Sequence, residues 1–294
     1  MTPTSALLQE LYTRMLLTRV VDELAWHLHL QGHIDFVASC RGHEAVQIGS
    51  AACIEVGKDF TLPYYRNLGV VLTIGMTPYE VFRTYLQPQY NGSKPRAMLH
   101  WGYHKHNTVT GTTSIATQIL HAAGIAFACK LRKDTVAAVA YCDHAAHQEA
   151  DFQEGLRFAA QHRLPLVIVC EKERTDQTVI SLPPNVQHIE ADGTNVLQVA
   201  ETMRQALQQA RDGAGPVFLE FSVVRFLPDF APTKQGIFAL EGPPDCDPLV
   251  QSRLQLQHLG LWDEERAQQL YRRLRHEVER ALEEALQEQP ARLP

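Results

Sequence analysis

The chain has 294 residues, and its 27 Lys and Arg against 33 Asp and Glu give a formal net charge of −6. This length gives room for one large or two small domains with a hydrophobic core. The acidic balance argues against a nucleic-acid-binding protein, which needs a basic surface, and a hydrophobic fraction of 45% argues against disorder. The 14 His and 6 Cys raise the question of a metal, redox or disulfide site.

The cysteines are not spaced for a zinc ribbon or a thioredoxin-like motif, because no two form a Cys-x-x-Cys pair. Cys142 and Cys170 end apolar runs, where a thiol is usually a small buried hydrophobic group. The first residues lack the basic and then apolar segments of a signal peptide. No apolar run reaches the ~18 residues of a membrane span. We therefore expect free thiols and a cytoplasmic location.

The amino-terminal half of the chain is predicted to be mainly helical. Spacing of apolar residues and end signals predict helices over 5–31, 43–56, 78–86 and 114–132. Gly32 ends the first of them, and Thr77 with Pro78 forms the N-cap and first-turn pair of the third. The segment 87–113 shows no periodicity, and such long stretches in compact domains are often functional.

The next part of the chain alternates strand and helix patterns. The predicted elements are strand 135–142, helix 147–162, strand 165–170, helix 194–212 and strand 216–224. The strand runs are continuously apolar, which is typical of strands buried on both faces. The sequence therefore predicts an α/β fold with a doubly wound, mostly parallel sheet flanked by helices. Ligands of such sheets bind beyond the carboxyl ends of the strands.

The remaining segments complete the expected organisation. We expect 171–188 and the proline-rich 225–248 to be irregular, and 263–288 to form one amphipathic helix, too short for a coiled coil. The domain prediction is an α/β domain over residues 1–248, including the amino-terminal helical segment. A helical extension over 249–294 would pack on the same domain.

A histidine-rich loop is the first candidate for a metal site. His100, His104 and His106 lie close together in the sequence, but a zinc site usually needs a fourth ligand, and the sequence offers no matching distant pair. The common phosphate-binding loops and the Gly-x-Ser-x-Gly elbow are also missing. Neither zinc chemistry nor the usual nucleotide and hydrolase chemistries are predicted.

Two polar positions beside predicted strands have alternative interpretations. Asp143 follows a strand and precedes a helix, so it could bind a divalent ion that bridges to a diphosphate, with Glu171 and Glu173 after the next strand as further oxygen ligands. It could also be a helix N-cap, a common use of Asp that the pattern alone favours. The planar fork of Arg66 suits a diphosphate, but the residue could equally belong to a surface turn.

Several longer segments resemble a known family. They are Arg41-Gly-His-Glu-Ala-Val-Gln, Pro63-Tyr-Tyr-Arg-Asn-Leu-Gly-Val, Ser114-Ile-Ala-Thr-Gln-Ile-Leu-His-Ala-Ala-Gly, Phe158-Ala-Ala-Gln-His-Arg-Leu-Pro-Leu-Val-Ile-Val-Cys-Glu, Asp247-Pro248-Leu249 and Gly260-Leu-Trp. Together these segments span most of the chain. They resemble the alpha subunit of thiamine-diphosphate-dependent 2-oxo acid dehydrogenases, the decarboxylating component, and most closely the branched-chain type.

The resemblance implies a thiamine-diphosphate-binding fold in which thiamine diphosphate and Mg²⁺ lie at the interface with a beta-type subunit. An α2β2 heterotetramer is the expected assembly, with a homodimer as the alternative. The catalytic glutamate that activates the aminopyrimidine would come from the partner subunit. An active enzyme would pass its product to a lipoyl-bearing acyltransferase core. Neither nucleic acid nor a membrane is an expected partner.

The resemblance also implies the roles of individual residues. The cofactor would be bound by Tyr65, Arg66, Thr113, Ile115 and Asp143. Mg²⁺ would be bound by Asp143 and Glu173. A monovalent cation, as in the branched-chain type, would be bound by Thr112, Thr117 and Gln118.

The chain departs from the family at the metal motif, which begins Gly-Asp-Gly and ends Asn-Asn. Cys142 and His144 replace the two glycines of this motif. Glycine at these positions lets the backbone approach the diphosphate closely, so we expect the side chains of Cys142 and His144 to crowd the diphosphate. Strand register keeps Asp143 at the acidic position, whereas counting back from the helix places His144 there. Lys172 and Glu173 replace Asn-Asn, and the Lys172 ammonium could take the place of the cation.

Two further departures concern loops. After Arg225 the chain reads Phe226-Leu-Pro-Asp-Phe, without the histidine of the family's diphosphate-contacting loop, and the segment between Ser181 and Asp192 is shorter than the family's. Three hypotheses follow. The chain is an active alpha subunit, a non-catalytic relative that has lost thiamine diphosphate and keeps a structural or regulatory role, or the holder of a different small-molecule site.

Overall fold

The computed structural model describes residues 3–34, 36–86, 101–102, 106–111, 114–226 and 243–288. Four positions for which the sequence suggested roles or alternatives lie outside these residues, namely Thr112, Thr113, His100 and His104. The described strands are β1 (Phe60–Leu62), β2 (Ala138–Asp143), β3 (Leu166–Glu173), β4 (Gln187–Asp192) and β5 (Val217–Val223). They form a parallel sheet in the order β1-β2-β3-β5-β4, which confirms the predicted α/β class.

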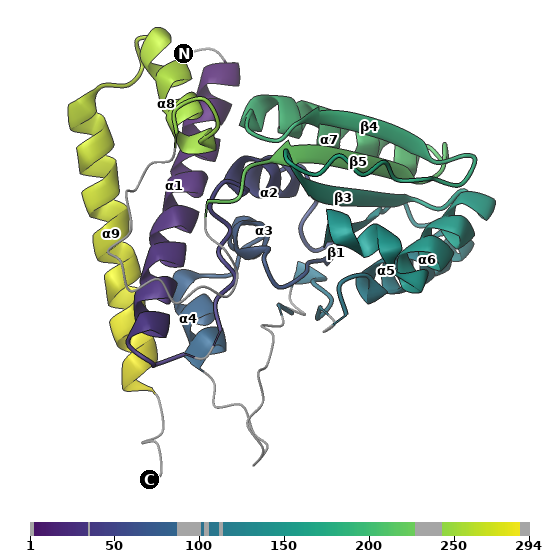
Figure 1. The fold of residues 1–294 in the computed structure, drawn as a ribbon, viewed down its shortest axis with the longest axis horizontal. Coiled ribbons are helices and arrows are strands. Elements are labelled where there is room, and N and C mark those ends of the chain that lie inside the picture. Colours follow the sequence, from purple (N-terminus) through teal and green to yellow (C-terminus); the bar gives the residue numbers. More distant parts are fainter. Residues whose placement is uncertain are drawn as a thin grey trace.

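Helices cover both faces of the sheet, as Figure 1 shows. On one face lie α5 (Thr117–Arg132) and α6 (Ala150–Gln161). On the other lie α2 (Glu44–Ala51), α3 (Leu68–Thr73) and α7 (Val196–Arg211). Side chains alternate between the two faces along each strand, so Ala138 and Ala140 pack under α5 and α6, whereas Val139 and Tyr141 pack under α2 and α7. The continuously apolar strands thus result from burial on both faces.

A second layer of helices stands beside the sheet. It consists of α1 (Pro3–Leu30), α4 (Pro78–Leu86), α8 (Pro248–His258) and α9 (Glu264–Gln287). The helices α1 and α9 run side by side (Figure 1), and Leu270 and Leu274 of α9 share a hydrophobic cluster with Leu8 and Leu11 of α1. Each of the two helices thereby buries the apolar stripe of the other.

A buried charge network ties this helical layer to the sheet domain. Arg19 of α1 donates from Nε to Glu44 Oε1 at 2.7 Å and from Nη1 to Asp247 Oδ2 at 2.7 Å. All three side chains are almost fully buried. Asp247 also accepts from the backbone of Leu249 at 2.9 Å and so caps α8. One guanidinium therefore joins α1, α2 and α8.

The predicted helices and strands are confirmed, and four further elements were missed. These are β1, α3, β4 and α8. β3 also runs on to Glu173 and β4 begins at Gln187, so the expectation that 171–188 is entirely irregular was wrong at both ends. The expected loop 225–248 ends at Pro248, the first residue of α8. A short segment between strands (His144–Gln148) forms a 3₁₀ helix, η2.

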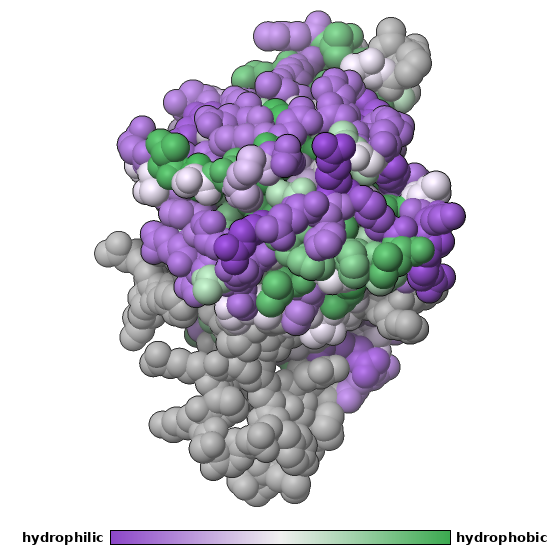
Figure 2. Space-filling view, turned by 90° about the vertical axis from the view of Figure 1, so that its right-hand side faces the viewer, coloured by the Kyte–Doolittle hydropathy of each residue, from purple (hydrophilic) through white to green (hydrophobic). Residues whose placement is uncertain are grey.

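The outer surface is mainly polar where the described residues are seen. Figure 2 views the molecule from the right of Figure 1, and hydrophilic residues predominate there around a smaller hydrophobic area. Within the described ranges, neither α1 nor α9 nor any shorter helix combines the length and apolarity needed to cross a membrane.

Candidate functional site

The carboxyl ends of β2 and β3 lie side by side. Asp143, the last residue of β2, is the register partner of Glu171 in β3, so both side chains leave the sheet on the same face. Asp143 thus lies at the end of β2, and its assignment to the acidic position of the family motif in place of His144 stays a prediction. The neighbouring pair Cys142 and Cys170 faces the core under α5 and α6 instead.

Glu171 is the centre of a buried hydrogen-bond network. Its carboxylate accepts from His43 Nδ1 at 2.9 Å, from Gln47 Nε2 at 3.0 Å, from Asn67 Nδ2 at 3.4 Å and from the hydroxyl of Tyr64. Burial acts to raise the pKa of Glu171, but the attraction of His43 and the hydrogen bonds from His43, Tyr64 and Gln47 outweigh it, so the pKa lies below its usual value. The network therefore keeps a carboxylate charged inside the protein.

Sequence reasoning missed this network, although it quoted the segment that contains His43. The Nε2 atom of His43 is buried and has no hydrogen-bond partner among the described residues. Burial of an unpaired polar atom is costly and calls for a partner. His43 precedes α2, whose amino-terminal end lies against the end of β5. There Gly42 has φ +90°, and a Cβ atom would come within 1.7 Å of the Val224 carbonyl oxygen.

The segment Tyr64–Asn67 places an arginine below the carboxyl edge of the sheet. Arg66 is fully buried and donates from Nη1 to the carbonyl oxygen of Ser39 at 2.9 Å. Its guanidinium carbon lies 5.5 Å from the centre of the half-buried Tyr65 ring. The alternative that Arg66 belongs to a surface turn was therefore wrong. The roles of Tyr65 and Arg66 toward a diphosphate remain predictions.

Asp143 caps η2 with one carboxylate oxygen, and its other oxygen is available to a ligand. Its Oδ1 accepts from the backbone of Ala145 at 2.8 Å, which caps η2 and confirms the N-cap interpretation. Its other carboxylate oxygen makes no hydrogen bond within the described residues. Because one oxygen is enough for a single metal bond, capping does not preclude the predicted binding of Mg²⁺.

The residues in place of Asn-Asn point to opposite faces of β3. Glu173 is partly exposed and pairs with Arg225 Nη2 at 2.7 Å. Lys172 donates to Glu220 Oε1 at 2.7 Å and to the carbonyl oxygen of Thr178 at 3.1 Å, on the face of Cys142 and Cys170. Strand alternation thus directs the Lys172 ammonium to Glu220, and the suggestion that it takes the place of the cation beside Glu173 was wrong.

The residues suggested for a monovalent cation are in part held by protein contacts. Thr117 donates its hydroxyl to Asp151 Oδ2 at 2.5 Å. The Gln118 amide donates to the carbonyl oxygens of Ile115 and Tyr141, each at 2.9 Å. These contacts bring Ile115, Thr117 and Gln118 together at the start of α5. Their roles toward a cofactor or a cation remain predictions.

Another acidic cluster lies at the exposed edge of the sheet. His188 Nε2 on β4 lies 3.8 Å from Glu190 and 3.5 Å from Glu220, a spacing that a cation could use. The Lys172 ammonium already pairs with Glu220, however, and would repel a cation there. We assign this cluster no metal.

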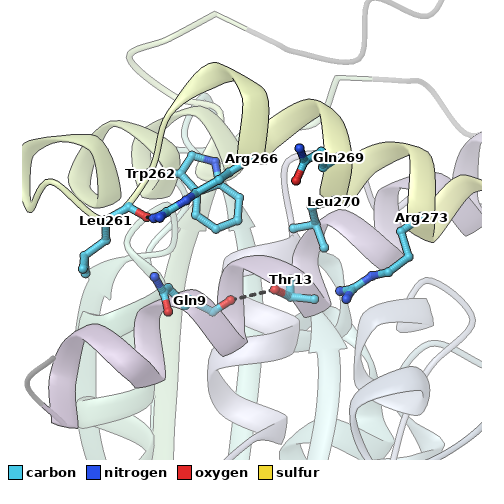
Figure 3. Close-up of a pocket in the computed structure, with 8 residues that line it drawn as sticks. All are labelled: Gln9, Thr13, Leu261, Trp262, Arg266, Gln269, Leu270 and Arg273. Atoms are coloured by element: carbon cyan, nitrogen blue, oxygen red, sulfur yellow. Dashed lines mark hydrogen bonds between the residues drawn. The ribbon is translucent and has the colours of Figure 1, made fainter.

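A groove between α1 and α9, drawn in Figure 3, has a volume of about 450 Å³. Its lining residues are Gln9, Thr13, Leu261, Trp262, Arg266, Gln269, Leu270 and Arg273. None of these is a carboxylate, a thiol or an imidazole, and the groove lies in the helical layer rather than at the carboxyl edge of the sheet. It offers no group for acid–base or metal chemistry, so the edge of the sheet remains the candidate site.

Comparison with known proteins identifies the family of the chain. The model of the family described as dehydrogenase E1 component matches residues 12–293. The chain is 32% identical to the 2-oxoisovalerate dehydrogenase subunit alpha of Bacillus subtilis, over 94% of this chain and 89% of the relative. It is 31% identical to the 3-methyl-2-oxobutanoate dehydrogenase subunit alpha of Mycobacterium tuberculosis, over 92% of this chain and 76% of the relative.

A relative named for pyruvate is also similar. The pyruvate dehydrogenase E1 component subunit alpha of Staphylococcus aureus is 28% identical, over 95% of this chain and 78% of the relative. The match spans α1 to α9 and includes the whole carboxyl edge of the sheet. The chain belongs to the dehydrogenase E1 component family.

Proposed function

We propose that the chain is the alpha subunit of a thiamine-diphosphate-dependent 2-oxo acid dehydrogenase, which decarboxylates a 2-oxo acid oxidatively and transfers the product to lipoamide. The family match over nearly the whole chain supports this activity. The observation in this chain that supports the activity is the position of Asp143. This residue ends β2 at the carboxyl edge of the sheet and has one carboxylate oxygen available within the described residues. Ligands of parallel sheets bind at this edge.

The residues at the edge fit a metal-bound diphosphate. Asp143 offers a hard oxygen ligand, and Glu173 offers a second one if it shares its carboxylate between Mg²⁺ and Arg225. The buried Nε2 atom of His43, at the same edge, has no hydrogen-bond partner within the described part of the chain. The resemblance assigns diphosphate contacts to Tyr65 and Arg66. When bound, thiamine diphosphate supplies the stabilised carbanion that decarboxylation needs.

The protein's own part in the reaction is to bind and orient the cofactor. The buried carboxylate of Glu171 fixes His43, Tyr64 and Gln47 beneath the edge, so the surface that meets the cofactor is rigid before binding. The group that activates the aminopyrimidine would be a glutamate of a beta-type partner. We expect an α2β2 assembly that delivers its product to a lipoyl-bearing acyltransferase core.

The relatives differ in the acid they are named for, so both classes are candidate substrates. Two are named for branched-chain 2-oxo acids and one for pyruvate. The branched-chain relatives have the higher identities, and we infer a branched-chain 2-oxo acid as the preferred substrate. Selectivity would depend on the volume of a pocket that both subunits line.

The test is release of CO₂ from 3-methyl-2-oxobutanoate and from pyruvate by the full chain co-purified with its beta-type partner. Asp143→Asn should lower the rate by more than about 100-fold, because even outer partners of a metal site cost ~10–100-fold when removed. Asp134→Asn, at an aspartate beyond the end of α5, should leave the rate unchanged. Equal rates for wild type and Asp143→Asn would contradict the proposal.

A further inference from the structure

The chain leaves the sheet through two turns that flank the candidate metal ligands. After Asp143 it enters η2, and after Glu173 it enters a turn over 174–178. The backbone of Asp176 donates to the carbonyl oxygen of Glu173 at 2.9 Å, which closes the second turn. Asp143 and Glu173 end neighbouring paired strands, and the two turns are the segments that directly follow them.

A histidine joins the two turns directly. His144 Nδ1 lies 2.8 Å from Asp176 Oδ2, and the imidazole is almost fully buried. The other oxygen of the same carboxylate accepts from the backbone of Thr178 at 2.8 Å. The hydrogen bonds from Thr178 and then from His144 lower the pKa of Asp176 to about 2. Asp176 thus uses one oxygen inside its own turn and the other to hold the neighbouring turn.

A lysine fixes the same turn from below. The Lys172 ammonium donates to the carbonyl oxygen of Thr178 at 3.1 Å while it pairs with the buried Glu220 at 2.7 Å. Both backbone groups of Thr178 are therefore held, its N–H by Asp176 and its carbonyl oxygen by Lys172. Lys172 belongs to β3 and its partner Glu220 to β5, whereas Asp176 lies in the turn and is held by His144 at the start of η2.

We propose that His144 and Lys172 are positioning residues that clamp the 174–178 turn to the ends of β2 and β3. The clamp holds the oxygen ligands on either side of the diphosphate site in place before any metal or cofactor binds. The residues at the Gly and Asn positions of the family motif thus join the two turns through protein contacts.

The first test follows hydrogen exchange of the 174–178 amides in the full chain without Mg²⁺ or cofactor. His144→Ala should speed exchange of the Thr178 and Asp176 amides by about tenfold or more. The substitution leaves in place the oxygen atoms of Asp176 and Glu173 that accept from these two amides. His121→Ala, which removes an exposed imidazole on α5, should leave them unchanged. Wild-type exchange in His144→Ala overturns the clamp.

A second variant set keeps the test decisive if His144→Ala fails to fold. Lys172→Met keeps the aliphatic stem and removes the donor to Thr178, and it should speed exchange of the same turn. Asp176→Asn keeps an amide oxygen that accepts from Thr178, and its amide nitrogen can donate to Nδ1 of a neutral His144, so the variant should preserve most of the protection. Unchanged protection of the turn in Lys172→Met would contradict the proposed contact of Lys172. Loss of protection in Asp176→Asn that is as complete as in Asp176→Ala would contradict the proposed contact of Asp176.

The second test measures positioning and rests on the proposed function. The affinity for thiamine diphosphate is titrated calorimetrically for the full chain with its beta-type partner, at low and at high Mg²⁺. His144→Ala should weaken binding by about tenfold at low Mg²⁺, and high Mg²⁺ should restore most of it, because the ion then links the two turns. An equal loss at both concentrations would show a general structural effect and overturn the positioning role.

The two tests separate the two proposals. If the wild-type complex binds no thiamine diphosphate at either Mg²⁺ concentration, the proposed function fails while the exchange data still decide the clamp. If the cofactor binds and His144→Ala matches wild type in both tests, the clamp fails and the proposed function stands.

Discussion

At the residue scale, Glu171 is the charge on which the floor of the site depends. A carboxylate without water around it is stable only if several donors compensate the burial, and His43, Gln47, Tyr64 and Asn67 supply them. Because its pKa in the folded protein lies below the usual 4.5, Glu171 contributes stability above that pH. The contribution is lost as the pH falls through the lower, folded-state value.

Glu171→Gln tests this charge. At pH 7 the variant should lose about 1–3 kcal/mol, because the donors around it lose a charged acceptor. As the pH falls from about 4.5 toward the lower pKa of the folded state, the stability that the charged Glu171 contributes is lost, so the difference in melting temperature between the two should shrink. Glu154→Gln, at an exposed glutamate of α6, is the control. A difference that stays constant from pH 7 to pH 3 would contradict a depressed pKa.

Sequence reasoning found residues whose position in a local pattern shows their role, and it missed those that meet only in the fold. Asp143 was predictable because a strand ended at it and a helix began after it. His43 and Glu171 are 128 residues apart, and no local pattern joins them. The partner of His144, Asp176, lay in a segment expected to be irregular. Its imidazole was therefore expected to crowd the diphosphate, whereas it binds a neighbouring turn.

At the element scale, the helices that the sequence missed are those whose ends are fixed by distant partners. α8 begins at Asp247 and Pro248, a cap and first-turn pair that sequence reasoning quoted as a family motif and placed in a loop. What holds this helix is the pairing of Asp247 with Arg19, which comes from α1. β4 was missed for a different reason, because it is an edge strand with mostly exposed side chains and no apolar run.

Two aspartates that cap helices allow the free energy of capping to be separated from that of a buried ion pair. Asp247 caps α8 and pairs with the buried Arg19, while Asp263 caps α9 in an exposed position. Asp263→Ala should cost about 1 kcal/mol of folding free energy, the usual value of an N-cap. Asp247→Ala should cost about 3–5 kcal/mol, because it leaves a buried guanidinium partly unpaired. Denaturant unfolding of both variants measures the two values, and equal costs would show that the buried pairing contributes nothing beyond the cap.

At the scale of the whole molecule, the sheet gathers the residues of the candidate site at one edge. The sheet collects Asp143, Glu173, the Glu171 network and Arg66 at one edge, while helices α1, α4, α8 and α9 form a separate layer beside it. This arrangement could be predicted in outline, since continuous apolar strands require helices on both faces. The family match supports thiamine diphosphate as the ligand that we propose for this edge.

The most direct measurement is a calorimetric titration of thiamine diphosphate with Mg²⁺ into the full chain co-purified with its beta-type partner. The account predicts saturable binding in the micromolar range or tighter, which Asp143→Asn abolishes and Asp134→Asn leaves intact. Absence of binding heat in a correctly assembled complex would contradict it, and would identify the chain as a relative that has kept the fold and lost the cofactor.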